Sequence, residues 1–458
     1  MQVSRRLFLK SGGIALASVG LLPALGPAFL RRAALGAEPG KRGKVLICLF
    51  QRGAADGLSV VTPFGDPDLY KLRQNIAVAS PKGGDAGTLL DLDGFFGLHP
   101  ALAPLLPIYK SGHMAVVHAA GSPSGTRSHF DAQDFMESGT PDNKSVPDGW
   151  LSRTALLCPE DRANGAKGKV LPAFHAVAMG GAMPRILSGS ANALAIPDLR
   201  SFGIQDRGLF TNRNRPKPMP GDDDVSEAER VLITAGTSAE GGFENIYDKA
   251  VGDVLHGSAT ESFEALGVLK HLNLKNYAPE NGAQYPNGGF GRSLQQIAQL
   301  IKADVGVQIA FADMGGWDTH VAQGGATGRL ANNLREWGGA IAALYNDLGD
   351  RMADVTILTM SEFGRAARQN GGGGTDHGHA NCYFALGGDV NGGKVLGKWP
   401  GLSDGQLYEN RDLAVTTDFR AVFSEVATRH LEIPTSQIAK LFPGYAGGPS
   451  DFRGVVRG

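Results

Sequence analysis

The sequence predicts an α/β fold in which helices sandwich a largely parallel β-sheet. Continuous apolar runs that are rich in β-branched residues, such as residues 44–50 and 355–360, are typical of strands buried on both faces. Between the apolar runs 305–312 and 355–360, residues 329–349 carry apolar side chains at alternating spacings of four and three. That stripe indicates a helix packed against a sheet, and the order strand, helix, strand favours parallel pairing.

The other elements follow from the same two patterns. Further strands are expected at residues 114–119, 170–179 and 382–386. Further helices are expected at residues 99–110, 130–138, 293–303 and 418–431. Residues 64–96 are rich in Gly, Asp and Pro and predict a loop. The segment at about 180–290 has scattered helical patterns around a polar stretch. We expect it to form a smaller inserted cap region beside the sheet.

Residues 1–37 resemble a twin-arginine export signal. The motif SRRLFLK at residues 4–10 precedes an apolar stretch at 12–30, and small residues at 34–37 offer a cleavage site. Two prolines and several glycines in the apolar stretch favour a signal over a transmembrane helix, with an uncleaved anchor as the alternative. The expected domain is therefore 38–458. We expect it to be folded before export through the twin-arginine machinery to a periplasmic or extracellular location.

Composition excludes several classes of function. Residues 1–37 contain five of the 44 basic residues and no acid, so 39 basic and 45 acidic residues remain, for a net charge of −6. With no basic block, nucleic acid is not an expected partner. The three cysteines imply no disulfide framework, and the absence of a cysteine cluster or dinucleotide fingerprint disfavours a redox enzyme. The composition leaves the oligomeric state open.

Polar residues follow the predicted strands at the point where each strand ends. Carboxyl ends of parallel strands meet at one edge of a sheet, where such folds bind ligands. Ser128 and His129 follow one strand, and four glycines at 371–374 let a later loop return to the same edge. Carboxylates and imidazoles that converge there suit one or two divalent ions such as zinc, manganese or calcium. The expected metal ligands are Asp56, Asp318, His320, Glu362, His377 and His379.

The same edge also offers groups for catalysis. Ser128 begins a predicted helix, and a hydroxyl at a helix N-terminus beside a metal is a candidate nucleophile. Thr126 is the alternative nucleophile. Arg127 and Arg365, or else Arg52, would hold the oxyanion of the substrate. Each assignment has a structural alternative. Asp56 would then be a turn former, Ser128 a helix cap, and Glu362 the ion-pair partner of Arg365 or Arg368.

The order of these residues resembles that of the alkaline phosphatase superfamily, which includes sulfatases and phosphonate hydrolases. The resemblance implies an alkaline-phosphatase-like fold and metal-dependent hydrolysis of phosphate or sulfate esters. In it, Asp56 corresponds to the first metal ligand and Ser128 to the nucleophile, while Asp318 and His320 correspond to a later Asp/His pair. Where those hydrolases carry Asp-His, this chain has Glu362-Phe363.

A narrower resemblance rests on the export signal together with the motifs GWDTH, SEFGR and DHGHAN. These motifs look like those of an uncharacterised bacterial family, a domain of unknown function, over most of residues 40–445. Two functions are therefore expected. The first is an exported metal-dependent hydrolase acting on a small ester or a polysaccharide. The alternative is a non-catalytic exported protein that uses the same fold for binding or assembly.

Overall fold

The computed structural model describes residues 43–81, 87–158, 174–189, 193–199 and 277–457. The expected export signal and most of the expected insertion lie outside these residues. Among the helices that are described, none combines the length and the apolar character needed to cross a membrane.

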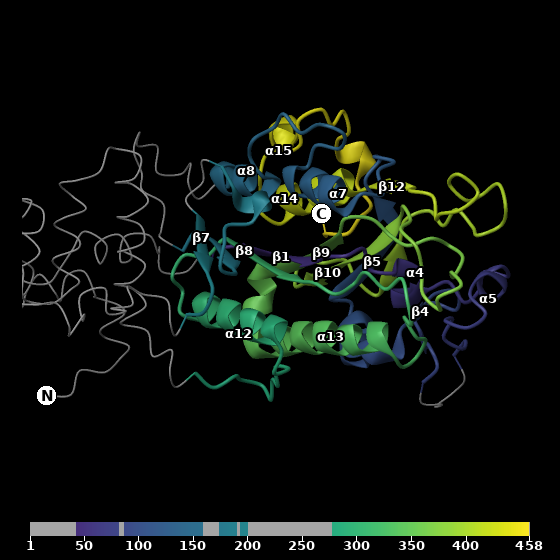
Figure 1. Ribbon diagram of the computed structural model, residues 1–458. Helices are drawn as coiled ribbons and strands as arrows, with labels where there is room; N and C mark the ends of the chain where they lie inside the picture. The colour runs from purple at the N-terminus through teal and green to yellow at the C-terminus, as the bar shows by residue number, and fades with distance from the viewer. Residues whose placement is uncertain (1–42, 82–86, 159–173, 190–192, 200–276, 458) are drawn as a thin grey trace, which may run out of the picture.

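The described part of the chain is built around one large, mostly parallel sheet, which confirms the α/β fold class (Figure 1). Its strands are β1 (Val45–Gln51), β5 (Met114–Gly121), β6 (Ala176–Met179), β7 (Ala193–Ile196), β8 (Ile309–Met314), β9 (Val355–Ser361), β10 (Asn381–Gly387), β11 (Lys394–Leu396) and β12 (Thr417–Asp418). They follow the order β11-β5-β10-β9-β1-β8-β6-β7, and β12 pairs with β5. Because β1, β5, β8 and β9 run in one direction, their carboxyl ends share one edge of the sheet.

Strand β10 is antiparallel to both of its neighbours, β9 and β5. The chain returns from β9 to β10 through residues 362–380, which contain no helix that could cross over the sheet. Both ends of this loop therefore lie at the edge where β9 ends. The loop carries four of the residues expected in the site, namely Glu362, Arg365, His377 and His379.

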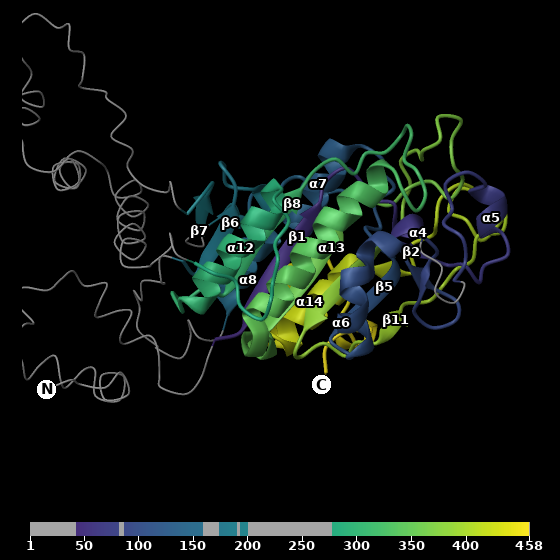
Figure 2. The same ribbon diagram turned by 90° about the horizontal axis from the view of Figure 1, so that it is seen from below.

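One face of the sheet is covered by α12 (Gly289–Lys302) and α13 (Arg329–Leu348), together with the 3-10 turn η1 (Pro100–Leu105) and α6 (Leu106–Lys110). Figure 2 shows α12 and α13 lying over this face of the sheet. The apolar stripe expected on α13 is buried, as predicted. The expected helix at 99–110 begins as a 3-10 turn because its prolines lack the amide hydrogens of a regular α-helix.

The opposite face is covered by α7 (His129–Ser138), α8 (Trp150–Leu157), α14 (Phe419–Arg429) and α15 (Ile438–Leu441) (Figure 1). Strand β1 shows how the two layers are held. Val45, Ile47 and Leu49 pack into the core beneath α12 and α13. The alternate residues, such as Leu46 and Phe50, pack into the core beneath α14.

The short elements were the hardest to predict. Residues 64–96, expected to be a loop, contain α5 (Leu69–Leu72) and β3 (Leu90–Asp91), which are too short to show a period. Strand β3 belongs to a small sheet with β2 (Val61–Thr62) and β4 (Gly97–Leu98), and α4 (Gly57–Val60) precedes β2. Strand β7, which lies inside the segment expected to be an insertion, instead extends the main sheet beside β6. The remaining 3-10 turns are η3 (Arg185–Leu187), η5 (Gly349–Asp354), η6 (Thr435–Gln437) and η7 (Pro449–Asp451).

The buried His118 on β5 predicts a pH-dependent stability. Its Nε2 donates to the Val61 carbonyl at 2.8 Å, while its Nδ1 accepts from the Ala119 amide at 2.9 Å. Burial lowers the pKa of His118 from 6.5 to about 4. Between these two pH values the imidazole is protonated in the unfolded chain but neutral in the folded chain, so stability falls as the pH falls. This residue should therefore cost about 3 kcal/mol of folding free energy between pH 6.5 and 4. Urea unfolding across this range should show a shallower pH dependence for His118→Gln than for the wild type. Equal slopes would contradict the prediction.

Candidate metal centre

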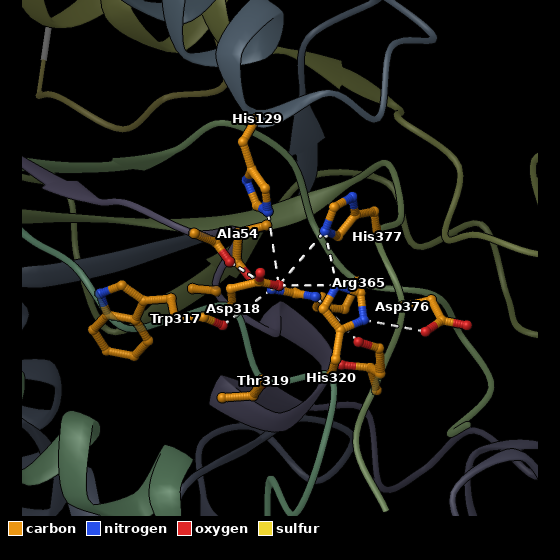
Figure 3. Close-up of polar contacts among 12 residues, drawn as sticks. Ala54, His129, Trp317, Asp318, Thr319, His320, Arg365, Asp376 and His377 are labelled. Atoms are coloured by element: carbon orange, nitrogen blue, oxygen red, sulfur yellow. Dashed lines mark hydrogen bonds and ion pairs between the residues drawn. The ribbon is translucent and has the colours of Figure 1, made fainter. Parts of the chain in front are cut away.

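Four side chains from three separate segments point toward one another at the carboxyl edge of the sheet (Figure 3). His129 is the first residue of α7, at the end of the loop that follows β5. Asp318 and His320 lie in the loop after β8, and His377 lies in the loop between β9 and β10. These four residues form a candidate metal site, which we call the metal centre. The structure thus brings together three of the predicted ligands, Asp318, His320 and His377.

The three imidazoles converge on one carboxylate oxygen. The Nε2 atoms of His320, His377 and His129 lie 3.1, 3.5 and 3.7 Å from Oδ1 of Asp318. The Nε2 atoms of His320 and His377 are 2.9 Å apart. Nε2 of His129 is a buried atom without a hydrogen-bond partner. Ligand atoms of His129, Asp318 and His377 all lie within 4.8 Å of one another, close enough to share an ion.

The second nitrogen of each imidazole is already engaged by an acceptor. Nδ1 of His129 lies 2.8 Å from Oε1 of Glu362, and Nδ1 of His320 lies 3.2 Å from Oδ1 of Asp376. Nδ1 of His377 lies 2.8 Å from the carbonyl oxygen of Arg127. Carboxylates and carbonyls only accept hydrogen bonds, so each Nδ1 carries the hydrogen. In a neutral imidazole, Nε2 then presents a lone pair.

This arrangement suits a cation. Burial lowers the pKa of His377, which favours the neutral ring. Two lone pairs that face each other at 2.9 Å, beside a carboxylate, repel unless a positive charge lies among them. A histidine that donates its other ring N–H to a carboxylate or carbonyl is the usual form of a metal-bound imidazole. The donors present therefore fit a divalent metal ion.

The donor set narrows the choice of ion. Three imidazoles and one carboxylate suit zinc, iron or manganese, whereas calcium prefers six to eight oxygen ligands. Calcium, which the sequence left open, does not fit this set. Within the residues that the structure describes, His129, Asp318 and His377 are the one group with metal-ligand spacing, and His320 lies beside it, which favours a single ion.

Asp318 is held in place by Arg365. Nη2 of Arg365 donates to Oδ1 of Asp318 at 2.5 Å. Burial would raise the pKa of Asp318, but the hydrogen bond and charge of Arg365 outweigh it, so the pKa is lowered and the carboxylate stays ionised. The remaining donors of this buried guanidinium go to backbone carbonyls of Gly53, Ala54 and Thr375, among others. Arg365 therefore positions Asp318, and its side chain, at 0% exposure, is not placed to contact a substrate oxyanion.

Glu362 lies behind the centre as the carboxylate that orients His129. Its side chain is fully buried, and its Oε1 also accepts from the amide of Gly53 at 2.8 Å and from Nε2 of Gln133 at 2.9 Å. Burial would raise the pKa of Glu362, but the hydrogen bond with His129 and the other donors lower it. With its Oε1 saturated in this way, Glu362 acts through His129 and not as a ligand itself.

Removing the charge of Glu362 should weaken metal binding without removing a ligand. Loss of an outer carboxylate typically costs about 10- to 100-fold in metal affinity. We expect Glu362→Gln, which keeps the shape of the side chain, to raise the dissociation constant for Zn²⁺ by this factor. A competition titration with a chromogenic chelator would measure it. An unchanged dissociation constant would show that His129 needs no charged partner.

Two of the predicted ligands lie away from the centre. The buried Asp56 pairs with Arg73, whose Nη1 lies 2.6 Å from its Oδ2. His379 is also buried, and its Nε2 lies 3.0 Å from the carbonyl oxygen of Ser122. Both residues are near the correct edge of the sheet, but their side chains point into other contacts.

The predicted catalytic groups are also engaged elsewhere. Oγ of Ser128 caps α7 by accepting from the amide of Asp131 at 3.4 Å, as in the structural alternative. Oγ1 of Thr126 accepts from the amide of Ser128. Arg127 forms ion pairs with Asp412 and Glu409, and Arg52 pairs with Asp313 and Glu137.

The ligand that the sequence did not single out is His129. It follows Ser128 directly, so it occupies the first turn of a helix that begins just after a strand, at the predicted ligand edge. That position was the available signal, because a side chain there points across the end of the sheet.

A protein-family model matches residues 231–442 of the chain. No curated protein matches the chain. The matched stretch is shorter than the expected 40–445, and it contains Asp318, His320 and His377 but not His129. Residues 231–442 match the model of an uncharacterised family, described as "Protein of unknown function (DUF1501)".

Proposed function

We propose that this protein is an exported metal-dependent hydrolase of phosphate or sulfate esters. The observation that supports the proposal most is the convergence of three imidazoles on Asp318, with every Nδ1 held by an acceptor. A structural histidine cluster has no need of three Nε2 atoms directed at one carboxylate oxygen. The position of the centre, at the carboxyl edge of a parallel sheet, is also where such folds bind substrates.

The centre has the openness that hydrolysis requires. The side chains of Asp318 and His320 are 44% and 39% exposed, so one side of the four ligands faces solvent. A divalent ion there would supply a nucleophile from water at neutral pH and withdraw charge from the ester. Water would attack phosphorus or sulfur, the bond to the ester oxygen would break, and an alcohol and an inorganic anion would leave. Water is the better nucleophile here because Ser128 serves as the cap of α7.

The surroundings favour an ester with an apolar alcohol group. Phe130 and Val321 are 91% and 64% exposed, the highest values among the large apolar side chains that the structure describes. Each directly follows a residue of the metal centre, His129 and His320. We propose that these two side chains contact the apolar part of the substrate, since exposed apolar groups of this kind mark binding surfaces.

The test combines metal analysis with a panel of esters. The mature protein, purified without chelators, should hold one zinc, iron or manganese ion per chain. It should hydrolyse benzyl phosphate or sulfate better than the methyl esters, whose alcohol is an equally good leaving group. His377→Ala should remove both the metal and the activity, whereas Phe130→Ala should keep the metal and lose the preference for benzyl esters. Activity that survives in metal-free His377→Ala would overturn the proposal.

A second function is favoured by the ion pairs that three arginines form within the chain. Arg52, Arg127 and Arg365, the three expected to hold an oxyanion, are all paired with carboxylates of the same chain. A metal-stabilised binding or assembly protein would show this arrangement. Such a protein would bind the ion and turn over no ester in the panel, which separates it from the hydrolase.

The exported location is part of the proposal and rests on the motif at residues 4–10. Cell fractionation of the full chain tests it. We expect the protein in the periplasm or medium, and we expect Arg5→Lys combined with Arg6→Lys to retain it in the cytoplasm. An unchanged distribution would contradict export by the twin-arginine pathway.

A further inference from the structure

A buried polar network lies directly behind the metal centre. It includes Asp56, Arg73, Thr319, Gln323 and Thr375, each between 0% and 1% exposed, and the buried Ser59. Asp56 follows β1, Arg73 follows α5, and Gln323 and the two threonines belong to the two loops that carry Asp318, His320 and His377. The network therefore connects the end of a central strand to the segments that bear the ligands.

The side-chain amide of Gln323 has its orientation fixed by Asp56. Nε2 of Gln323 donates to Oδ2 of Asp56 at 2.7 Å. An ionised carboxylate only accepts hydrogen bonds, so the NH₂ group must face Asp56 and the amide oxygen must face the other way. Arg73 keeps Asp56 ionised through a contact of 2.6 Å to the same oxygen.

The amide oxygen of Gln323 joins the two ligand-bearing loops. It accepts from Oγ1 of Thr319 at 2.8 Å and from Oγ1 of Thr375 at 2.9 Å. Thr319 lies between Asp318 and His320, while Thr375 lies two residues before His377. One oxygen atom thus fixes the spacing of segments that supply three of the four ligands. The amide of Thr375, which donates to the carbonyl of Thr319 at 3.2 Å, supports the same spacing.

We propose that Gln323, oriented by Asp56, is a positioning residue that sets the affinity and geometry of the metal centre. The proposal rests on the metal centre of the proposed function and does not depend on hydrolysis. It also gives Asp56 a role. The carboxylate at the end of β1 does not bind the ion, but it aligns the amide that holds the loops bearing the ligands.

The test measures metal binding by variants that keep the shape of the network. Gln323→Met removes the amide, and Thr319→Val removes one hydroxyl. We expect the dissociation constant for Zn²⁺ to rise about 10- to 100-fold for Gln323→Met and several-fold for Thr319→Val, by the same reasoning as for outer ligands. The visible spectrum of the Co²⁺-loaded protein should shift in both variants. Thr319→Ser, which retains the hydroxyl, should restore the wild-type affinity and spectrum.

A buried carboxylate far from the centre provides the matched control. Asp347 on α13 accepts from Tyr277 and Tyr285 at 2.6 and 2.8 Å. Asp347→Asn should lower the melting temperature and leave the Zn²⁺ affinity and the Co²⁺ spectrum unchanged. Wild-type affinity and spectrum in Gln323→Met would overturn the positioning role while leaving the metal centre intact. Failure of the wild type to bind Zn²⁺ or Co²⁺ would overturn both.

Discussion

Replacing His129 with alanine is expected to abolish tight metal binding. His129 supplies the one Nε2 of the metal centre that is buried and without a hydrogen-bond partner among the described residues. This nitrogen is therefore available to bind an ion. Deleting a ligand should cost more than the ~100-fold that loss of an outer partner can cost. Metal content after dialysis, measured by elemental analysis, should fall from one ion per chain to a trace amount.

Two further alanine variants make the comparison specific. His113 is half-buried and contacts Tyr345, and His379 contacts the carbonyl of Ser122, so neither belongs to the centre. His113→Ala and His379→Ala should both retain the ion. If His379→Ala loses metal while His129→Ala keeps it, then the ligand set expected from the sequence is right and the one argued from the geometry is wrong.

The fold was largely predictable because its central elements are long and strongly periodic. Helix α13 spans 20 residues with one buried stripe, and β1 and β9 each bury seven consecutive residues. A long stripe with a helical period indicates a helix, and a continuous apolar run indicates a central strand. Strand β7 has four residues with an alternating burial pattern, and the sequence offered no reason to separate it from a loop. The antiparallel direction of β10 depends on the length of the preceding loop and the absence of a helix in it, and not on the residues of the strand.

The sequence predicted which edge of the sheet carries the candidate site, but not what each carboxylate does there. Asp56, Glu362 and Asp318 all follow strands at one edge, and a sequence cannot tell which carboxylate faces solvent. The structure separates them by burial. Asp318 is partly exposed and faces the three imidazoles, Glu362 is buried beneath α7 and holds His129, and Asp56 is buried with Arg73. Side-chain direction at a strand end depends on the turn that follows, and that turn is set by long-range contacts.

Replacing Asp56 with asparagine is expected to cause the largest loss of stability. Arg73 is 1% exposed, and Asp56 is the carboxylate that neutralises it. Breaking a buried ion pair by removing one partner costs about 3–5 kcal/mol, because the other charge stays buried without compensation. Urea unfolding should show this decrease in the free energy of unfolding for Asp56→Asn. The exposed pair of Asp68 and Lys71 provides the control, and Asp68→Asn should leave the free energy of unfolding close to that of the wild type.

The double variant Asp56→Asn with Arg73→Met identifies the cause of the loss. Replacing both charges with neutral side chains removes the uncompensated guanidinium, so most of the lost stability should return. Metal affinity should not return with it, because asparagine can turn its amide and no longer fixes the orientation of Gln323. The double variant would then have most of the wild-type stability but a weakened affinity for the metal. If Asp56→Asn alone is as stable as the wild type, the hydrogen bonds from Arg73 to the carbonyls of Ala366 and Ala367 are sufficient to hold the buried charge.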